Sequence, residues 1–273
     1  MRSVVLALGM LVWVSLAHAQ QPLVPAGSVV NSGSYTAQGV APGSLVSIFG
    51  TDLAASTSSG NTIPLSTTLS DVTSVTFNDI PAGLYFVNSG QINAQLPFNV
   101  LASGQTSGMV SVVVTRGNVS SLPSSVSVAS VSPGIFTTNA EGTGQAFAYD
   151  NSTGDLAAPV GPAIGPFTTV PISRTSRHAL IIACTGLGSV TPPIGNYVAA
   201  SDGTFRNTVL TPTVLIGGVP ATFVYSVLSP QFVSEYQIGV VPAPSTPTGD
   251  AVSLQIQIDG VTTTNQVTIA VAP

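Results

Sequence analysis

The side chains that most often act in hydrolysis are scarce in this sequence. Apart from a predicted leader, the 273-residue chain has one histidine, His178, and one cysteine, Cys184. A hydrolytic triad needs a nucleophile, a base and an orienting acid within hydrogen-bond reach. His178 and Cys184 would lie roughly 20 Å apart on a regular strand, and no Gly-x-Ser-x-Gly elbow occurs. We therefore predict no catalytic residue: Cys184 should be a small buried strand residue, and His178 a surface residue where that strand begins.

The acidic residues are dispersed, whereas a metal site needs converging His, Cys or carboxylate ligands. No Asp-x-Asp pair occurs, and most of the acids precede Gly or lie in predicted turns. The acids are Asp52, Asp71, Asp79, Glu141, Asp150, Asp155, Asp202, Glu235, Asp250 and Asp259. We predict neither a metal site nor a cofactor, with a loop Ca²⁺ at Asp150 and Asp155 as the alternative. A glycosidase carboxylate pair is unsupported, because the chain has only two Glu and neither can be placed opposite a partner.

Aromatic pairs follow a Pro-Ala turn at two places, as Tyr85-Phe86 and as Phe223 with Tyr225. An alternating strand should bury one aromatic of each set, so core packing is the preferred interpretation. The alternative is an exposed aromatic patch that binds a glycan or a peptide. The sequence itself assigns no ligand-binding residue.

Composition excludes several classes of protein. The chain has no Lys, 5 Arg and 10 acids, against 34 Ser and 30 Thr, so the formers of long solvated helices are nearly missing. With 44% hydrophobic residues and a low net charge, the chain should fold. The only basic cluster, Arg174 with Arg177 and His178, is too small for nucleic acid or an anionic membrane surface.

The first 19 residues are predicted to be a secretory signal peptide. Arg2 precedes an apolar run from Val4 to Leu16, and Ala17-His18-Ala19 has the small-x-small form of a cleavage site. The run is about a third shorter than the roughly 20 residues that span a bilayer. We therefore expect an exported protein, secreted or periplasmic, with no membrane insertion after cleavage. Because Cys184 is the only cysteine, the protein must rely on its core rather than on disulfides.

The remainder of the chain contains a repeat. Similar segments recur in the same order: Leu45–Leu53 with Ala179–Leu187, Val75–Ala82 with Val214–Ala221, and Gln91–Pro97 with Gln237–Pro242. Each copy ends in two strands of strict polar and apolar alternation, which is typical of antiparallel sheets with one face in water. We predict two β-sandwiches of roughly 100 residues each, with a single large barrel as the alternative. The domains should be residues 22–132 and 133–273, with an irregular Gly/Pro-rich segment at 139–176.

Several strings resemble a known family. They are Val29-Val-Asn-Ser-Gly-Ser-Tyr35, Ala41 to Ala54, Gly90-Gln-Ile-Asn93, Ser132-Pro-Gly-Ile-Phe136 and Thr185-Gly-Leu-Gly188. Over nearly the whole mature chain they resemble the uncharacterised Solibacter-type C-terminal domain of secreted bacterial proteins. Each half is also similar to the IPT/TIG class of immunoglobulin-like domains, through Gly50-Thr-Asp-Leu53 and the Pro-Ala hairpin. The resemblance implies two tandem immunoglobulin-like sandwiches and no known catalytic residues. Cys184 departs from it, because the first copy has Gly50 there.

These observations favour an exported, non-catalytic interaction or structural module. A carbohydrate-binding module is the alternative, and a hydrolase with an unrecognised site is less favoured. The expected partner is a protein or a surface polymer. It should bind at the loops of a sandwich or along an unpaired edge strand, because the chain lacks the Lys that commonly guards sheet edges.

Overall fold

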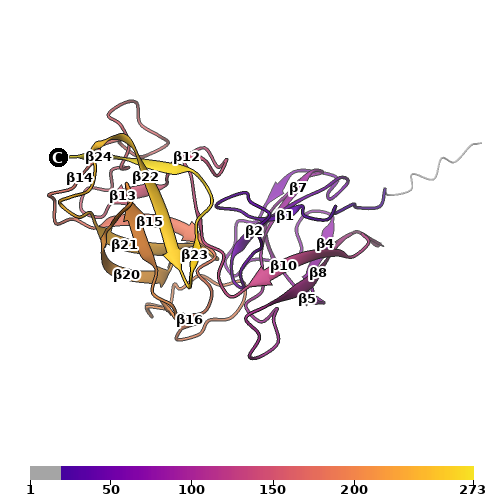
Figure 1. The fold of residues 1–273 in the computed structure, drawn as a ribbon. Coiled ribbons are helices and arrows are strands. Elements are labelled where there is room, and N and C mark those ends of the chain that lie inside the picture. The colour runs from indigo at the N-terminus through magenta and orange to yellow at the C-terminus, as the bar shows by residue number, and fades with distance from the viewer. Residues whose placement is uncertain (1–19) are drawn as a thin grey trace, which may run out of the picture.

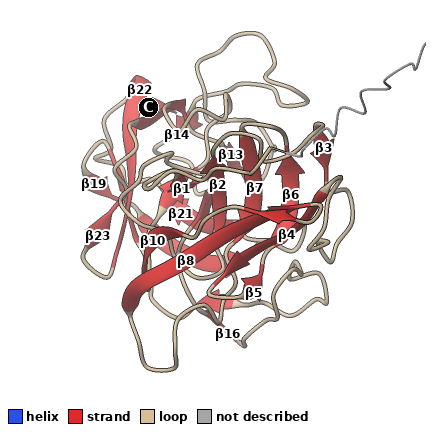
Figure 2. Ribbon diagram, turned by 90° about the vertical axis from the view of Figure 1, so that its right-hand side faces the viewer, coloured by secondary structure: helices blue, strands red, loops and turns tan. Residues whose placement is uncertain are grey.

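The structure is a computed structural model that describes residues 20–273, and all its regular elements in that range are strands (Figure 2). The predicted signal peptide, residues 1–19, lies outside the described residues. Four sheets form two β-sandwiches that follow one another along the chain, one from indigo to magenta and one from rose to yellow (Figure 1). The predicted fold class, two tandem immunoglobulin-like sandwiches rather than one barrel, is confirmed. No helix in residues 20–273 is long and apolar enough to cross a membrane.

The first sandwich has the strand order of a constant-type immunoglobulin domain, with sheets ABED and CFG. In its first sheet, strands A, B, E and D are β1 (Val29–Asn31), β2 (Leu45–Phe49), β7 (Gln91–Gln95) and β6 (Gly83–Val87), and β3 (Ser58–Ser59) is added at the edge of β6. The facing sheet runs β10 (Ser124–Ala129), β8 (Ser107–Arg116), β4 (Val72–Phe77) and β5 (Ile80–Pro81), and β9 (Val119–Ser120) pairs with β8.

The second sandwich repeats this order. Its ABED sheet runs β11 (Gly134–Ile135), β15 (Leu180–Thr185), β21 (Tyr236–Val241), β20 (Thr222–Leu228), β17 (Asn207–Thr208) and β16 (Val190–Thr191), with β13 (Ala148–Asp150) on β15. The facing sheet runs β12 (Gly144–Gln145), β24 (Val267–Ala272), β22 (Gly249–Ile258), β18 (Thr213–Ile216) and β19 (Val219–Pro220). Two short strands complete it, β14 (Ile172–Ser173) on β24 and β23 (Val261–Thr262) on β22.

The repeat extends to individual hydrogen bonds. The Ser121 hydroxyl accepts a bond from the Val114 N–H, and the Thr263 hydroxyl accepts one from the Ile256 N–H, both at 3.1 Å. Strand register also agrees, because β2 pairs with β7 as β15 pairs with β21. The two halves are therefore built on one plan, down to side chains that bond to the backbone.

Local sequence explains the elements. In β22 the burial alternates, with Leu254, Ile256 and Ile258 on the core side. The hairpin between β4 and β5 turns at Asn78-Asp79, with φ of 48° and 63°, and Gly217-Gly218 serves the same turn in the second half with 59° and 78°. Two-residue hairpin turns of type I′ need positive φ at both positions, which Asn, Asp and Gly tolerate. Apolar alternation and turn chemistry together specify these strands.

The segment 139–176, expected to be irregular, contains three short strands. β12 and β14 both pair in parallel with β24, and β13 pairs antiparallel with β15. β12 and β14 therefore cover the outer edge of β24, and β13 extends the other sheet beside β15.

Side chains from both sandwiches meet at a junction. A loop of the second sandwich reaches the first, where Asn196 accepts a 2.8 Å bond from the Phe98 N–H and the Tyr197 hydroxyl donates to the Pro81 carbonyl at 2.6 Å. The Asn265 amide of the second sandwich also donates to the Gly33 carbonyl of the first at 3.3 Å. The sandwiches are thus held by specific polar contacts as well as by the connecting chain.

Candidate binding surface

Cys184 and His178 lie in different environments. Cys184 is fully buried in β15, and burial, followed by the nearby Glu235 carboxylate, raises the pKa of its thiol well above the usual range. A thiol in that state is a poor nucleophile, because the thiolate is the reactive form. His178 is exposed just before β15. Both positions agree with what the sequence predicts.

His178 nevertheless belongs to a polar cluster that the sequence reasoning missed. Its Nδ1 lies 2.7 Å from the Ser152 hydroxyl and 3.1 Å from an Asp150 carboxylate oxygen, and the Ser152 hydroxyl also donates to Asp150 at 2.7 Å. The pairing of β13 with β15 brings these side chains together, and no local motif announces it. The only sequence signal is the Asp150-Asn-Ser turn.

The geometry of this cluster does not match a catalytic triad. In a triad the two ring nitrogens of His contact different partners, the nucleophile and the acid. Here both contacts of His178 meet at Nδ1. Partial burial acts to raise the pKa of Asp150, but hydrogen bonds from Ser152 and His178 outweigh it and lower that pKa. The cluster therefore stabilises a turn around an ionised carboxylate.

The carboxylates proposed for a loop Ca²⁺ contact different groups. Asp150 bonds to Ser152 and His178, and Asp155 accepts a hydrogen bond from Thr168. Within residues 20–273, no group of three or more His, Cys, Asp or Glu side chains is arranged to hold a metal ion.

The prediction that each aromatic pair buries one ring in the core is wrong. Tyr85 and Phe86 are both half-buried, and Phe223 is 42% exposed while Tyr225 is half-buried. A β-bulge interrupts the register between Leu84 and Phe86 and again between Phe223 and Tyr225. Because a bulge inserts one extra residue, the alternation on which the prediction depends fails at these positions.

In the first half the bulged residue, Tyr85, belongs to the junction. Its hydroxyl donates to the Val233 carbonyl at 2.9 Å, and its ring packs on a small apolar cluster of Leu65, Ala199 and Val233. Burial raises the pKa of Tyr85 to about 12. This ring therefore contributes to the contact between the sandwiches.

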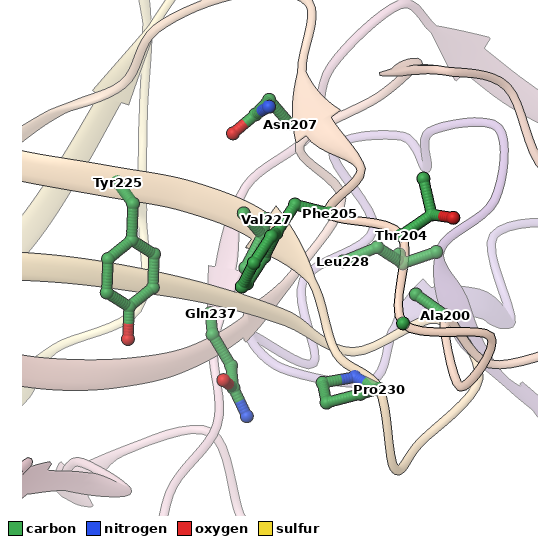
Figure 3. A pocket seen from close by; sticks show the side chains of 10 residues that line it. Ala200, Thr204, Phe205, Asn207, Tyr225, Val227, Leu228, Pro230 and Gln237 are labelled. Atoms are coloured by element: carbon green, nitrogen blue, oxygen red, sulfur yellow. The ribbon is translucent and has the colours of Figure 1, made fainter.

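In the second half the corresponding part of the sheet carries a pocket of about 700 Å³. That volume lies within the roughly 300–1,000 Å³ of small-ligand sites, which are mostly apolar with a few polar groups. Its lining comes from β17, β20, β21, the loop before β17 and the loop after β20 (Figure 3): Ala200, Gly203, Thr204, Phe205, Asn207, Tyr225, Val227, Leu228, Pro230 and Gln237. Apart from the Tyr225 phenol, none of these side chains is ionisable.

An ion pair fixes the loop that carries Phe205. The Arg206 guanidinium binds both Asp202 carboxylate oxygens at 2.7 Å, and Asp202 also accepts a 3.0 Å bond from the Thr204 N–H. These contacts lower the pKa of the Asp202 carboxyl, and the hydrogen bond from Arg206 contributes most. Phe205 lies between Thr204 and Arg206 in this turn, and the residue is 79% exposed. The loop thus presents a large apolar ring to solvent in a defined position.

Further aromatic side chains lie where the two sandwiches meet. A smaller depression of about 200 Å³ is lined by Leu45, Tyr85, Phe136, Phe232, Val233 and Glu235. Burial raises the pKa of Glu235, although a 3.3 Å bond from Gln237 opposes the rise. We call Phe136, Phe205, Tyr225 and Phe232 the aromatic face. Phe205 and Phe232 are the members that are most exposed, at 79% and 52%.

No protein-family model and no curated protein matches the sequence. Among solved structures, two of the full extracellular region of plexin A4 match at 12% identity, with TM-scores of 0.29 and 0.28. Both matches cover 95% of this chain, which spans 19% and 17% of the respective plexin chains. The immunoglobulin-like fold stated above follows from the strand order of the two sandwiches themselves.

Proposed function

We propose that the protein is an exported, non-catalytic interaction module that binds a partner protein or a surface polymer on its aromatic face. One observation carries the proposal: a 700 Å³ apolar pocket opens beside the exposed Phe205 ring, which an ion pair holds in place. Ordered, exposed aromatic rings provide contact area at low entropic cost and are frequent in binding sites.

Export and the absence of catalysis belong to the same proposal. The signal-like residues 1–19 and the resemblance to a domain of secreted bacterial proteins support export. Two features support a non-catalytic role: the buried thiol of Cys184, and a His178 whose ring meets both partners at one nitrogen.

The test is a capture experiment with the mature chain, residues 20–273. Immobilised wild-type protein is incubated with the cell envelope and culture medium of the producing organism, beside Phe205→Ser and Met109→Ser variants. Met109 is a matched control, because it is 65% exposed on β8 of the first sandwich. We expect Phe205→Ser to lose at least ten-fold of the captured material and Met109→Ser to retain it. Equal capture by all three proteins would contradict the proposal.

A carbohydrate-binding role is the second candidate, favoured by one specific observation. The Asn207 and Gln237 amides line the pocket together with the Phe205 and Tyr225 rings, so neutral hydrogen-bonding groups lie beside aromatic surface. Affinity electrophoresis in gels of neutral polysaccharides tests this role. Retardation of the wild type that Phe205→Ala removes would support it, and unchanged mobility in all gels would exclude it for those polymers.

A further inference from the structure

The two sandwiches differ at one sheet edge. In the first, residues 58–66 cover the outer edge of β6, with Ser58 and Ser59 paired to that strand. The Gly60 N–H then donates to the Tyr85 carbonyl, and the Leu84 N–H donates to the Ser66 carbonyl, each at 2.8 Å. The outward-facing main-chain groups of the bulge in β6 are therefore satisfied by the same chain, which bonds to them through Gly60 and Ser66 on either side of a bend at residues 62–64.

The corresponding edge in the second sandwich lacks this cover. β20 pairs with β21 as β6 pairs with β7, bulge included, so Phe223 corresponds to Leu84 and Val224 to Tyr85. β17 meets β20 only at the Asn207–Val227 pair. Beside this pair, the Leu228 N–H donates to the Arg206 carbonyl at 2.9 Å. Within residues 20–273, the Phe223 N–H and the Val224 carbonyl make no backbone hydrogen bond to a flanking segment. The corresponding groups of Leu84 and Tyr85 each make one.

The length of one connection explains the difference. In the first sandwich, residues 60–71 link β3 to β4 and are long enough to run along β6. In the second, only residues 209–212 link β17 to β18, and the Val209 N–H bonds to Ser189, away from β20. The short link cannot reach the edge beside Phe223.

The exposed edge has the composition of a strand that pairs. From Thr222 to Leu228, β20 has no charged residue and no Pro, the usual protections of a free edge. Phe223 and Val224 are 42% and 50% exposed. Tyr225 and Val227 of the same strand line the pocket. Because alternate side chains of a strand share one face, a segment paired here can direct a side chain over that pocket.

We propose that the edge of β20 binds an extended, uncharged segment of a partner protein as an added antiparallel strand. The added strand occupies the place that residues 58–66 hold in the first sandwich. It bonds to the Phe223 N–H and the Val224 carbonyl and places an apolar side chain in the pocket beside Phe205. This inference rests on the proposed function and names the chemistry of the ligand. In this mode of binding, main-chain hydrogen bonds provide the affinity and pockets for alternate side chains provide the specificity.

The probe is a blocked nine-residue peptide of alternating Thr and Val, N-methylated at every second residue so that one edge stays free and self-stacking is prevented. A fully N-methylated peptide is its control. In the free protein, the Phe223 amide should exchange its hydrogen at least a hundred-fold faster than the Leu84 amide. The probe should slow exchange at Phe223 at least ten-fold, and the control peptide should leave it unchanged. These measurements use the unaltered sequence, so they do not depend on a variant folding.

Two variants separate the main chain from the side chain. Phe223→Pro removes the edge N–H and should weaken probe binding at least ten-fold, whereas Phe223→Ala keeps the N–H and should weaken it less than three-fold. Equal loss in both variants, or equal binding of the fully N-methylated peptide, would overturn strand addition. A dimer that forms without peptide and dissociates in Phe223→Pro would also overturn it, because a second copy would then be the occupant. None of these outcomes alters the Phe205→Ser capture result, which tests the proposed function separately.

Discussion

The Thr185 hydroxyl joins the two sandwiches, since it accepts a 2.9 Å bond from the Leu45 N–H and donates a 2.7 Å bond to the Ser234 carbonyl. Thr185 is fully buried. Its counterpart by strand register, Thr51, is exposed and pairs through its backbone with Leu23. The same residue of the repeat therefore serves the junction in one half and the surface in the other.

Replacing Thr185 by Val should destabilise the protein. The change keeps the shape but leaves the Leu45 N–H and the Ser234 carbonyl without this partner, and each buried unsatisfied group costs about 1–3 kcal/mol. The measurement is the midpoint of urea unfolding. Thr51→Val is the matched control and should stay within about 0.5 kcal/mol of the wild type, as surface substitutions usually do. Equal midpoints for both variants would contradict a structural role of this contact.

Tyr85 should make stability fall at alkaline pH. Burial raises its pKa to about 12 in the folded state, against about 10 in an unfolded chain. The folded state thus holds this proton more tightly, so the contribution is complete below pH 10 and is lost as the pH rises towards 12. Urea midpoints of wild type and Tyr85→Phe between pH 8 and 11.5 test it. The difference between the two proteins should change across that range; a constant difference would refute this.

Substitution of His178 or Cys184 by Ala should leave any hydrolase activity of the purified protein unchanged. Cys184 is buried as a neutral thiol, and His178 lacks triad geometry. Ester and peptide substrates assayed with both variants provide the measurement. Abolition of an activity by either change would mean that the protein is an enzyme.

Partner binding should respond little to salt. Residues 20–273 contain four Arg and no Lys, and the charges next to the aromatic face are the partly buried Glu235 and the Asp202–Arg206 pair, whose charges cancel. Electrostatic steering is therefore small, and screening has little to remove. Affinity measured at 20 and 150 mM NaCl should agree within about three-fold. A loss of ten-fold or more would indicate a charged interface instead.

The sequence predicts the sandwiches well because their strands obey local rules. Alternation in β22 and the Asn78-Asp79 and Gly217-Gly218 turns depend on neighbouring residues only. The bulges at Tyr85 and Val224 break that alternation, and neither bulged residue is itself a Gly or a Pro. The contact of Asp150 with His178 requires the pairing of β13 with β15, and the Phe205 pocket requires three strands and two loops. Such features depend on contacts between distant residues, which periodicity does not contain.

The loop that carries Asn196 and Tyr197 has a mechanical consequence. The chain leaves the first sandwich near Pro133, yet this later loop returns to it and bonds to Phe98, Asn99 and Pro81. Tension applied between residues 20 and 273 must therefore break those bonds before the sandwiches can part. We expect the pair to resist stretching as one stiff unit, which would let it transmit force between a surface and whatever it holds.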